Sequence, residues 1–186
     1  NIPAYIFILP LWIVLLLKIK KEKLNAILVY SAIVNVLIVI HFSVLPLNSF
    51  IDGVEDKDGA LYYGWPSIGN KIETLINENP KELQILTTSY RTASLLSFQL
   101  DRSDIYSYSP RFDQFDYWTN KLTYDKQDAI ILSDDWQPIN GELKEVVENI
   151  SIVDTIHIKR FGFKIKDYYI YKASIRDKYL KIANKK

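Results

Sequence analysis

The distribution of hydrophobic residues divides the chain into an apolar N-terminal part and an amphipathic remainder. Residues 2–17 contain no charged side chain, and residues 24–47 form a second apolar run that few polar residues interrupt. A membrane-spanning helix needs about 20 mostly apolar residues, so both runs predict spans, the first of them shortened at its start. A signal peptide would carry its positive charge before the apolar core, whereas here the lysines follow it.

The short link between the two apolar runs, residues 18–23, contains four lysines. The positive-inside rule places such a link in the cytoplasm, so the second helix leads outward and the remaining chain is extracytoplasmic. We therefore expect residues 1–47 to be the C-terminal part of a polytopic domain in the inner (plasma) membrane. The chain contains no methionine and begins with Asn1 inside an apolar run, and we expect further spans upstream.

The remainder predicts a linker over residues 48–62, an α/β domain over residues 63–173 and a basic tail over residues 174–186 that is helical or frayed. Apolar residues recur at helical spacing over residues 66–79, and short apolar runs with β-forming residues predict strands. The expected helices are residues 66–79, 114–122 and 141–148, together with one that runs to residue 100 with Thr88 or Ser89 as its N-cap. The expected strands are 83–87, 104–107 and 129–132. Residues 150–159 and 164–172 predict a closing antiparallel hairpin. Strands that alternate with helices indicate a small, mostly parallel α/β sandwich.

Composition and motifs exclude several classes of function. The formal net charge is +1 and the lysines are interspersed with Asp and Glu, so no nucleic-acid partner is expected. The absence of cysteine excludes disulfides and thiolate chemistry. Asp134 and Asp135 follow a predicted strand, where ligands bind in such folds, and two carboxylates could take a metal, but no third ligand is evident and we favour a solvated turn. No cofactor is identified, and metal dependence is left open.

Three segments of the domain have a combination of residues that is more specific than a generic α/β pattern. They are Tyr63-Gly64-Trp65, then Ser89-Tyr90-Arg91-Thr92-Ala93-Ser94, and then Arg111 followed by Gln114-Phe115-Asp116-Tyr117-Trp118. In order and spacing they resemble the C-terminal region of the bacterial dolichyl-phosphate-mannose-protein mannosyltransferase-like glycosyltransferases. The resemblance covers about residues 52–173, with paired spans before it.

The resemblance implies a GT-C enzyme that transfers a sugar from a polyprenyl-phosphate carrier to an extracytoplasmic lipid, glycan or protein acceptor. In such enzymes the general base is a carboxylate in the first extracytoplasmic loop. That loop would lie upstream, so no catalytic residue is expected in this chain. The domain would then guide the acceptor or cover the active site, with membrane lipid and the carrier-linked sugar as its partners.

Two groups of residues are candidates for binding substrate. Tyr90 and Arg91 lie at a predicted helix start, where backbone amides and an arginine suit a phosphate or a sugar hydroxyl. The alternative, which we favour, is that Arg91 pairs with a local carboxylate and Tyr90 packs. The second group suits a sugar ring, and its members are Arg111, Gln114, Asp116 and Trp118. Equally well, Trp118 and Phe115 belong to the core and Arg111 pairs with Asp113 or Asp116.

Two other functions remain open. The chain could be a membrane-anchored binding or sensing module without catalysis, or a structural subunit with a large exposed apolar patch. The sequence has no glycine-rich phosphate loop and neither of the common serine-hydrolase and zinc-protease motifs. A self-contained soluble enzyme is therefore not expected.

Overall fold

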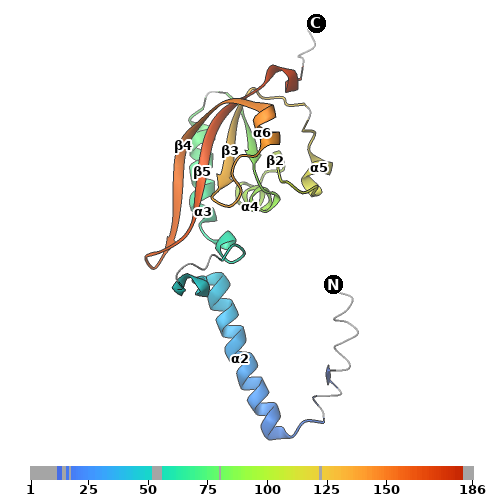
Figure 1. Ribbon diagram of the computed structural model, residues 1–186, viewed down its shortest axis with the longest axis vertical. Coiled ribbons are helices and arrows are strands. Elements are labelled where there is room, and N and C mark those ends of the chain that lie inside the picture. Colours follow the sequence, from blue (N-terminus) through green and yellow to red (C-terminus); the bar gives the residue numbers. More distant parts are fainter. Residues whose placement is uncertain are drawn as a thin grey trace. The chain divides into compact units, whose positions relative to one another are not determined.

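The computed structural model describes residues 12–13, 16, 18–51, 56–79, 81–121 and 123–181 (Figure 1). The chain divides into two compact units, residues 1–47 and residues 48–186. Nearly all of the first predicted span lies outside the described residues. Each unit is described by itself below.

The first unit contains one long apolar helix, α2 (Lys21–Ser43). Its 23 residues correspond to about 35 Å at 1.5 Å per residue, which exceeds the hydrocarbon thickness of a bilayer. None of its residues is buried, and the helix is long and apolar enough to cross a membrane. One such helix is found in the described part of the chain, at the position of the second predicted span.

The second unit is a mixed α/β domain built on a five-stranded sheet with the order β2-β1-β3-β5-β4. Its strands are β1 (Leu83–Thr87), β2 (Ile105–Ser107), β3 (Asp128–Asp134), β4 (Val147–Arg160) and β5 (Phe163–Ile175). β1 is parallel to both β2 and β3, whereas β5 is antiparallel to β3 and to β4. The α/β class and the closing hairpin are confirmed. The sheet is mixed rather than mostly parallel, because the hairpin joins it through β5.

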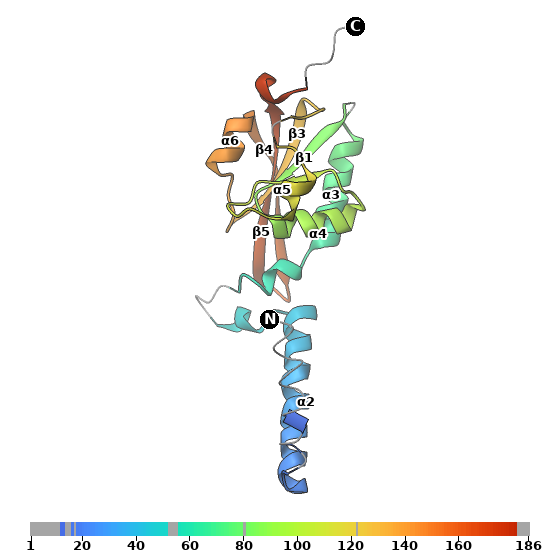
Figure 2. The same ribbon diagram turned by 90° about the vertical axis from the view of Figure 1, so that its right-hand side faces the viewer.

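Helices cover both faces of this sheet. Figure 2 shows α3 (Trp65–Asn77) and α4 (Tyr90–Leu100) on one side and α6 (Gly141–Val146) on the other. Alternate residues of β1 point to opposite faces, and both Ile85 and Leu86 are fully buried. Leu86 belongs to the core cluster that includes Leu143 and Val146 of α6. The sheet is therefore sandwiched between two apolar layers.

Several predicted bounds differ from the structure. The helix predicted over residues 141–148 ends at Val146, because Val147 and Glu148 pair with β5. The third helix, α5 (Gln114–Trp118), is shorter than predicted and ends where Thr119 is extended. Residues 174 and 175 belong to β5, and a single 3-10 turn, η3 (Asp177–Tyr179), follows. The start of the tail is therefore strand rather than helix, because Ser174 pairs with both Asp128 and Glu148. Residues 182–186 lie outside the described part.

The chain enters the domain through two short 3-10 helices, η1 (Leu47–Phe50) and η2 (Ala60–Tyr62). Gly64 then has φ +85°, and a Cβ on it would lie 2.3 Å from Cδ1 of Ile158 in β4. Trp65 is buried, donates its indole N–H to the Leu61 carbonyl at 2.6 Å, and packs edge-on against Tyr168. The Tyr63-Gly64-Trp65 segment therefore anchors the entry against the hairpin.

Candidate functional site

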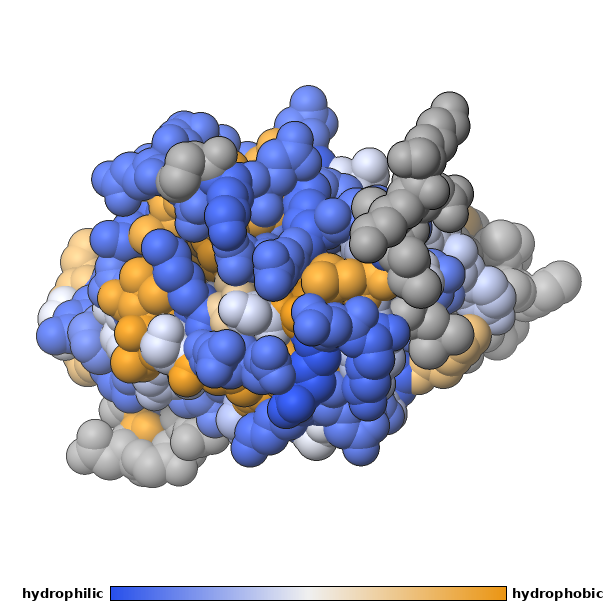
Figure 3. All heavy atoms as spheres, turned by 90° about the horizontal axis from the view of Figure 1, so that it is seen from above, coloured by the Kyte–Doolittle hydropathy of each residue, from blue (hydrophilic) through white to orange (hydrophobic). Residues whose placement is uncertain are grey.

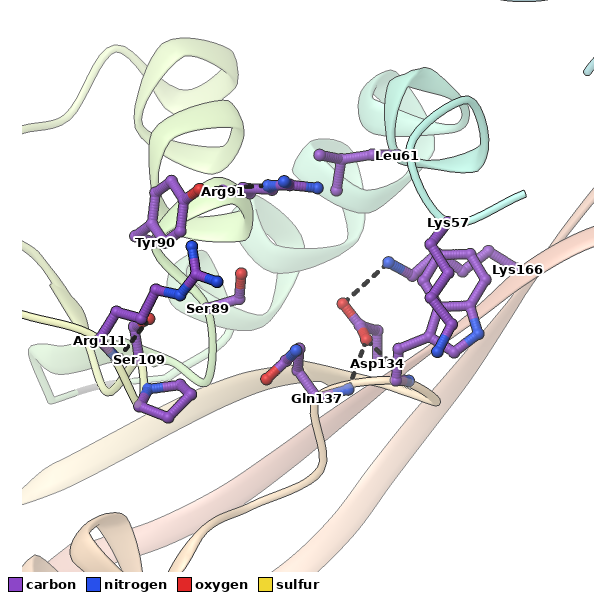
Figure 4. Close-up of a pocket in the computed structure, with 12 residues that line it drawn as sticks. Lys57, Leu61, Ser89, Tyr90, Arg91, Ser109, Arg111, Asp134, Gln137 and Lys166 are labelled. Carbon is purple, nitrogen blue, oxygen red and sulfur yellow. Dashed lines mark hydrogen bonds and ion pairs between the residues drawn. The ribbon is translucent and has the colours of Figure 1, made fainter. Parts of the chain in front are cut away.

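A pocket of about 230 Å³ opens at the carboxyl ends of the parallel strands. β1 lies between β2 and β3. The connection after β1 leads to β2 on one side of it, and the connection after β2 leads to β3 on the other side. Ligands bind at such a switch point in open α/β sheets. The residues that line the pocket are Lys57, Leu61, Ser89, Tyr90, Arg91, Ser109, Pro110, Arg111, Asp134, Trp136, Gln137 and Lys166 (Figure 4).

A buried ion pair forms one wall of the pocket. Lys166 Nζ lies 2.9 Å from Asp134 Oδ2, and each side chain is only 2% exposed. Asp134 Oδ1 also accepts the backbone N–H groups of Trp136 and Gln137, at 2.9 and 2.8 Å. The prediction of a solvated turn is therefore wrong for Asp134. Its carboxylate is fixed by three donors, and it is not available as a base.

The ammonium group of Lys166 lies against aromatic rings. Its Nζ is 4.2 Å from the centroid of the Trp136 ring and 5.0 Å from that of Tyr168. Burial lowers the pKa of Lys166, and the attraction of Asp134 opposes this effect. The aromatic faces favour the charged form through cation–π contact, so this end of the sheet holds a desolvated cation.

Tyr90 and Arg91 lie at the start of α4, where the sequence placed them. Ser89 is extended, and its side chain makes no capping hydrogen bond. The guanidinium of Arg91 bonds Asp58 Oδ1 at 2.5 Å, and its Nε donates to the Tyr90 hydroxyl at 3.3 Å. The hydrogen bond with Tyr90 and then that with Asp58 raise the pKa of Arg91. Arg91 therefore pairs with a carboxylate, but the expectation of a local partner is wrong, because Asp58 is distant from Arg91 in sequence.

Arg111 extends into the same pocket from the loop after β2 (Figure 4). Its backbone N–H donates to Ser109 Oγ at 3.4 Å, but within the described part of the chain its guanidinium has no ion-pair partner. Asp113 instead caps α5, and Asp116 forms an ion pair with Lys121. The alternative in which Arg111 pairs with Asp113 or Asp116 is therefore wrong, because both carboxylates are engaged elsewhere.

The other three predicted residues, Gln114, Asp116 and Trp118, lie on α5 and do not line this pocket. Asp116 accepts the backbone N–H of Asp113 at 2.7 Å. Burial acts to raise the pKa of Asp116, but the hydrogen bond from Lys121 and that backbone contact bring it below the usual value. The prediction of a core residue is confirmed for Phe115, which is buried, but is wrong for Trp118, which is 67% exposed and lies edge-on to Phe115. The structure therefore divides the predicted site.

Sequence reasoning missed Lys166, Trp136 and Gln137. Lys166 lies within the predicted hairpin strand of residues 164–172 and was not considered as a site residue. A signal was present, because residues 166, 168 and 170 share one face of a strand and both Tyr168 and Ile170 are fully buried. A lysine at the end of a buried row needs a carboxylate partner, and Asp134 lies at the end of the neighbouring strand.

The pocket is suited to binding an anion rather than to performing acid–base chemistry. Four cationic side chains line it, and Asp134 is the single carboxylate among the described lining residues. No histidine is among them; His157 instead contacts Asp167 at 2.8 Å. Across the described residues, no group of three or more His, Asp or Glu side chains is placed to hold a metal ion.

The comparisons with known proteins add no relative to this description. No protein-family model matches the chain. Searches among curated proteins and among solved structures likewise find no match.

Proposed function

We propose that this chain is the membrane-anchored C-terminal part of a polyprenyl-phosphate-sugar-dependent glycosyltransferase, and that its α/β domain binds an anionic group of the carrier or acceptor. The observation that supports the proposal most directly is Arg111. Its guanidinium enters a pocket in which Asp134 is already paired with Lys166 and Arg91 with Asp58. No carboxylate among the described residues neutralises the charge of Arg111, and a bound anion would do so.

Phosphate is the anion that fits these donors best. A guanidinium presents a planar set of N–H donors that matches phosphate geometry. The first-turn amides of α4 lie beside Ser89 without a side-chain cap, and helix N-termini favour anions. A carrier phosphate near the membrane surface would supply this group, with the attached sugar or lipid outside the pocket.

The chain's part in the transfer reaction is to bind and position, not to move a proton. Glycosyl transfer needs a carboxylate that accepts the proton of the attacking hydroxyl, and Asp134 is fixed by Lys166 and two backbone amides. In this proposal the base belongs to another loop of the full protein. In the proposed topology the lysines of residues 18–23 are cytoplasmic, and the domain is on the side of the membrane on which carrier-bound sugars are presented.

The test is binding of phosphate probes to the whole chain in lipid nanodiscs. A short polyprenyl phosphate is compared with the matching polyprenol and with inorganic phosphate. Arg111→Gln removes one charged hydrogen-bond donor and lowers affinity for both phosphate probes by about ten- to a hundredfold. Arg102→Gln is the matched control, because Arg102 pairs with Asp104 at the opposite end of the sheet. Equal phosphate affinity in wild type and Arg111→Gln would reject the site.

A non-catalytic sensing module is the second candidate. The absence of an available base among the described pocket residues favours it, because binding alone needs none. The two functions differ in a sugar-transfer assay with the complete protein. Arg111→Gln lowers transfer if the domain serves an enzyme, whereas a sensing module loses phosphate binding without any transfer activity to lose.

A further inference from the structure

The turn of the β4–β5 hairpin contains a phenylalanine, Phe161, whose backbone conformation is unfavourable for a bulky residue. Arg160 and Phe163 are the last paired residues, so Phe161 and Gly162 form a two-residue turn. Both have positive φ, +49° and +86°, the arrangement of a type I′ turn that favours Asn-Gly. A bulky residue in the left-handed region is a marked outlier, and the Phe161 side chain is also 71% exposed. Neither the backbone nor burial within the domain accounts for this phenylalanine.

Cationic side chains surround the turn. Lys159, Arg160 and Lys164 are exposed on the two strands beside it. The nearby carboxylate of Asp167 is already engaged, by Lys164 at 2.8 Å and by His157 at 2.8 Å. The tip of the hairpin therefore combines an exposed aromatic ring with excess positive charge.

The hairpin turn and the chain entry occupy the same end of the domain. The guanidinium of Arg160 lies 5.7 Å from the ring centroid of Tyr63, and Gly64 packs against Ile158. The carboxyl end of β3 is directed toward this end of the domain, because β3 is antiparallel to β5 and Asp134 pairs with Tyr168 in the first half of β5. The pocket at the carboxyl ends of the strands therefore opens toward this end. Figure 3 views the opposite end of the domain, where hydrophilic residues cover most of the visible surface.

We infer that the hairpin turn inserts Phe161 into the headgroup region of the lipid bilayer that α2 crosses. An exposed aromatic residue flanked by Lys and Arg is typical of segments that lie in a membrane interface, and anionic headgroups attract such cations. The chain continues from α2 into the domain through Tyr63 and Gly64, and these residues contact the hairpin beside its turn. A lipid bilayer is therefore the occupant that we propose for this surface. The inference depends on α2 as a span, but not on the ligand of the pocket.

The test uses the whole chain in vesicles of equal parts phosphatidylcholine and phosphatidylglycerol. The sequence has no cysteine, so Phe161→Cys gives a single site for an environment-sensitive fluorophore. Val36→Cys within α2 is the positive control. Phe98→Cys is the negative control, because Phe98 is exposed near the C-terminal end of α4, away from the end of this helix that borders the pocket. The label at residue 161 shows a blue shift and quenching by doxyl-labelled lipid, whereas the label at residue 98 shows quenching by aqueous iodide.

A second variant separates the phenylalanine from the attached label. The fluorophore is placed at Lys164→Cys, with or without Phe161→Asn, which suits the turn geometry. Lipid quenching at residue 164 falls when Phe161 is replaced. Equal lipid quenching with and without Phe161 would overturn the inference, as would strong iodide quenching at residue 161. Protection from iodide that rises with protein concentration, without lipid quenching, would assign the turn to a protein contact and also overturn it.

Discussion

Two groups of paired charges lie at opposite ends of the same sheet and differ in their exposure to solvent. At the carboxyl ends of the parallel strands, Lys166 and Asp134 form a pair in which each side chain is 2% exposed. At the starts of these strands, Arg102 and Asp104 are 29% and 47% exposed, with Nη2 and Oδ2 separated by 2.6 Å. Lys126 adds a third charge at 3.4 Å from Asp104.

The difference in exposure indicates that stability explains one of these ion pairs less well than the other. Exposed ion pairs contribute roughly 0–1 kcal/mol, because water already solvates both charges. A buried pair must overcome the desolvation of both ions, and apolar residues in its place are often as stable or more stable. A buried lysine–aspartate pair at the wall of a pocket is therefore poorly explained by stability, and it accords with a role in recognising an anion.

The largest expected effect comes from breaking the buried pair. Lys166→Met retains contact with Trp136 and Tyr168 but leaves Asp134 as a buried charge without its cation. We expect the free energy of unfolding to fall by about 3–5 kcal/mol. Urea unfolding of the whole chain in detergent, followed by tryptophan fluorescence, measures the loss.

The double variant Asp134→Asn/Lys166→Met is the control for this prediction. The amide oxygen of the new asparagine side chain would still accept the backbone N–H groups of Trp136 and Gln137, which Asp134 Oδ1 accepts at 2.9 and 2.8 Å. Stability should recover most of the loss, because neither charge remains buried. A double variant as unstable as Lys166→Met would show that packing, rather than the unpaired carboxylate, causes the loss.

This contrast between the two ends could be predicted only in part from the sequence. Local signals located β1, whose bounds are as predicted, and the start of α4 after Ser89. They also identified Arg111, which lies in the pocket with Tyr90 and Arg91.

Signals that depend on long-range pairing were missed. The partner of Lys166 is distant in sequence, and only the pairing of β3 with β5 brings the two together. Sequence proximity also grouped Trp118 with Arg111. The structure separates them, because Asp113 and Asp116 form a capping box that begins α5 as a helix. Short polar motifs indicated candidate binding residues, but they did not indicate which of these residues share a pocket.

Gly64→Ala tests whether close packing, as well as the buried ion pair, stabilises the end of the domain that contains the pocket. In Gly64→Ala the new Cβ meets Ile158 at 2.3 Å while the backbone keeps φ +85°. The left-handed backbone costs about 1–2 kcal/mol and overpacking about 1–3 kcal/mol, so we expect a total loss of about 2–5 kcal/mol. Thermal unfolding of the domain measures it.

Gly162→Ala is the matched control for Gly64→Ala. It has nearly the same φ, +86°, but nothing lies within 4 Å of its added Cβ. Only the backbone penalty applies, so its loss of stability should be the smaller by about 1–3 kcal/mol. Equal losses at both glycines would mean that Ile158 moves aside freely.

Phe161→Asn should raise stability, in contrast to the two preceding changes at the same end. Asn tolerates the left-handed conformation that Phe161 adopts at φ +49°, and it is favoured in this type of turn. We expect a gain of about 0.5–1 kcal/mol in the free energy of unfolding, within the range for improved turns. A loss of stability would show that the Phe161 ring makes stabilising contacts within the domain.

The smallest effect is expected at the exposed end, where Asp104→Asn should cost less than about 1 kcal/mol at neutral pH because solvent screens the pair. The hydrogen bonds from Arg102 lower the pKa of Asp104 to about 2. A carboxyl whose pKa is depressed on folding stabilises the folded state above its unfolded pKa, near 3.9, and loses this contribution as the pH falls toward 2. The stability difference between wild type and Asp104→Asn should therefore shrink between about pH 4 and pH 2.

Asp116, Asp154 and Asp167, whose pKa values are also lowered, titrate in both proteins and cancel in the difference. A difference that stays constant across this range would show that the Arg102–Asp104 pair contributes no stability through charge.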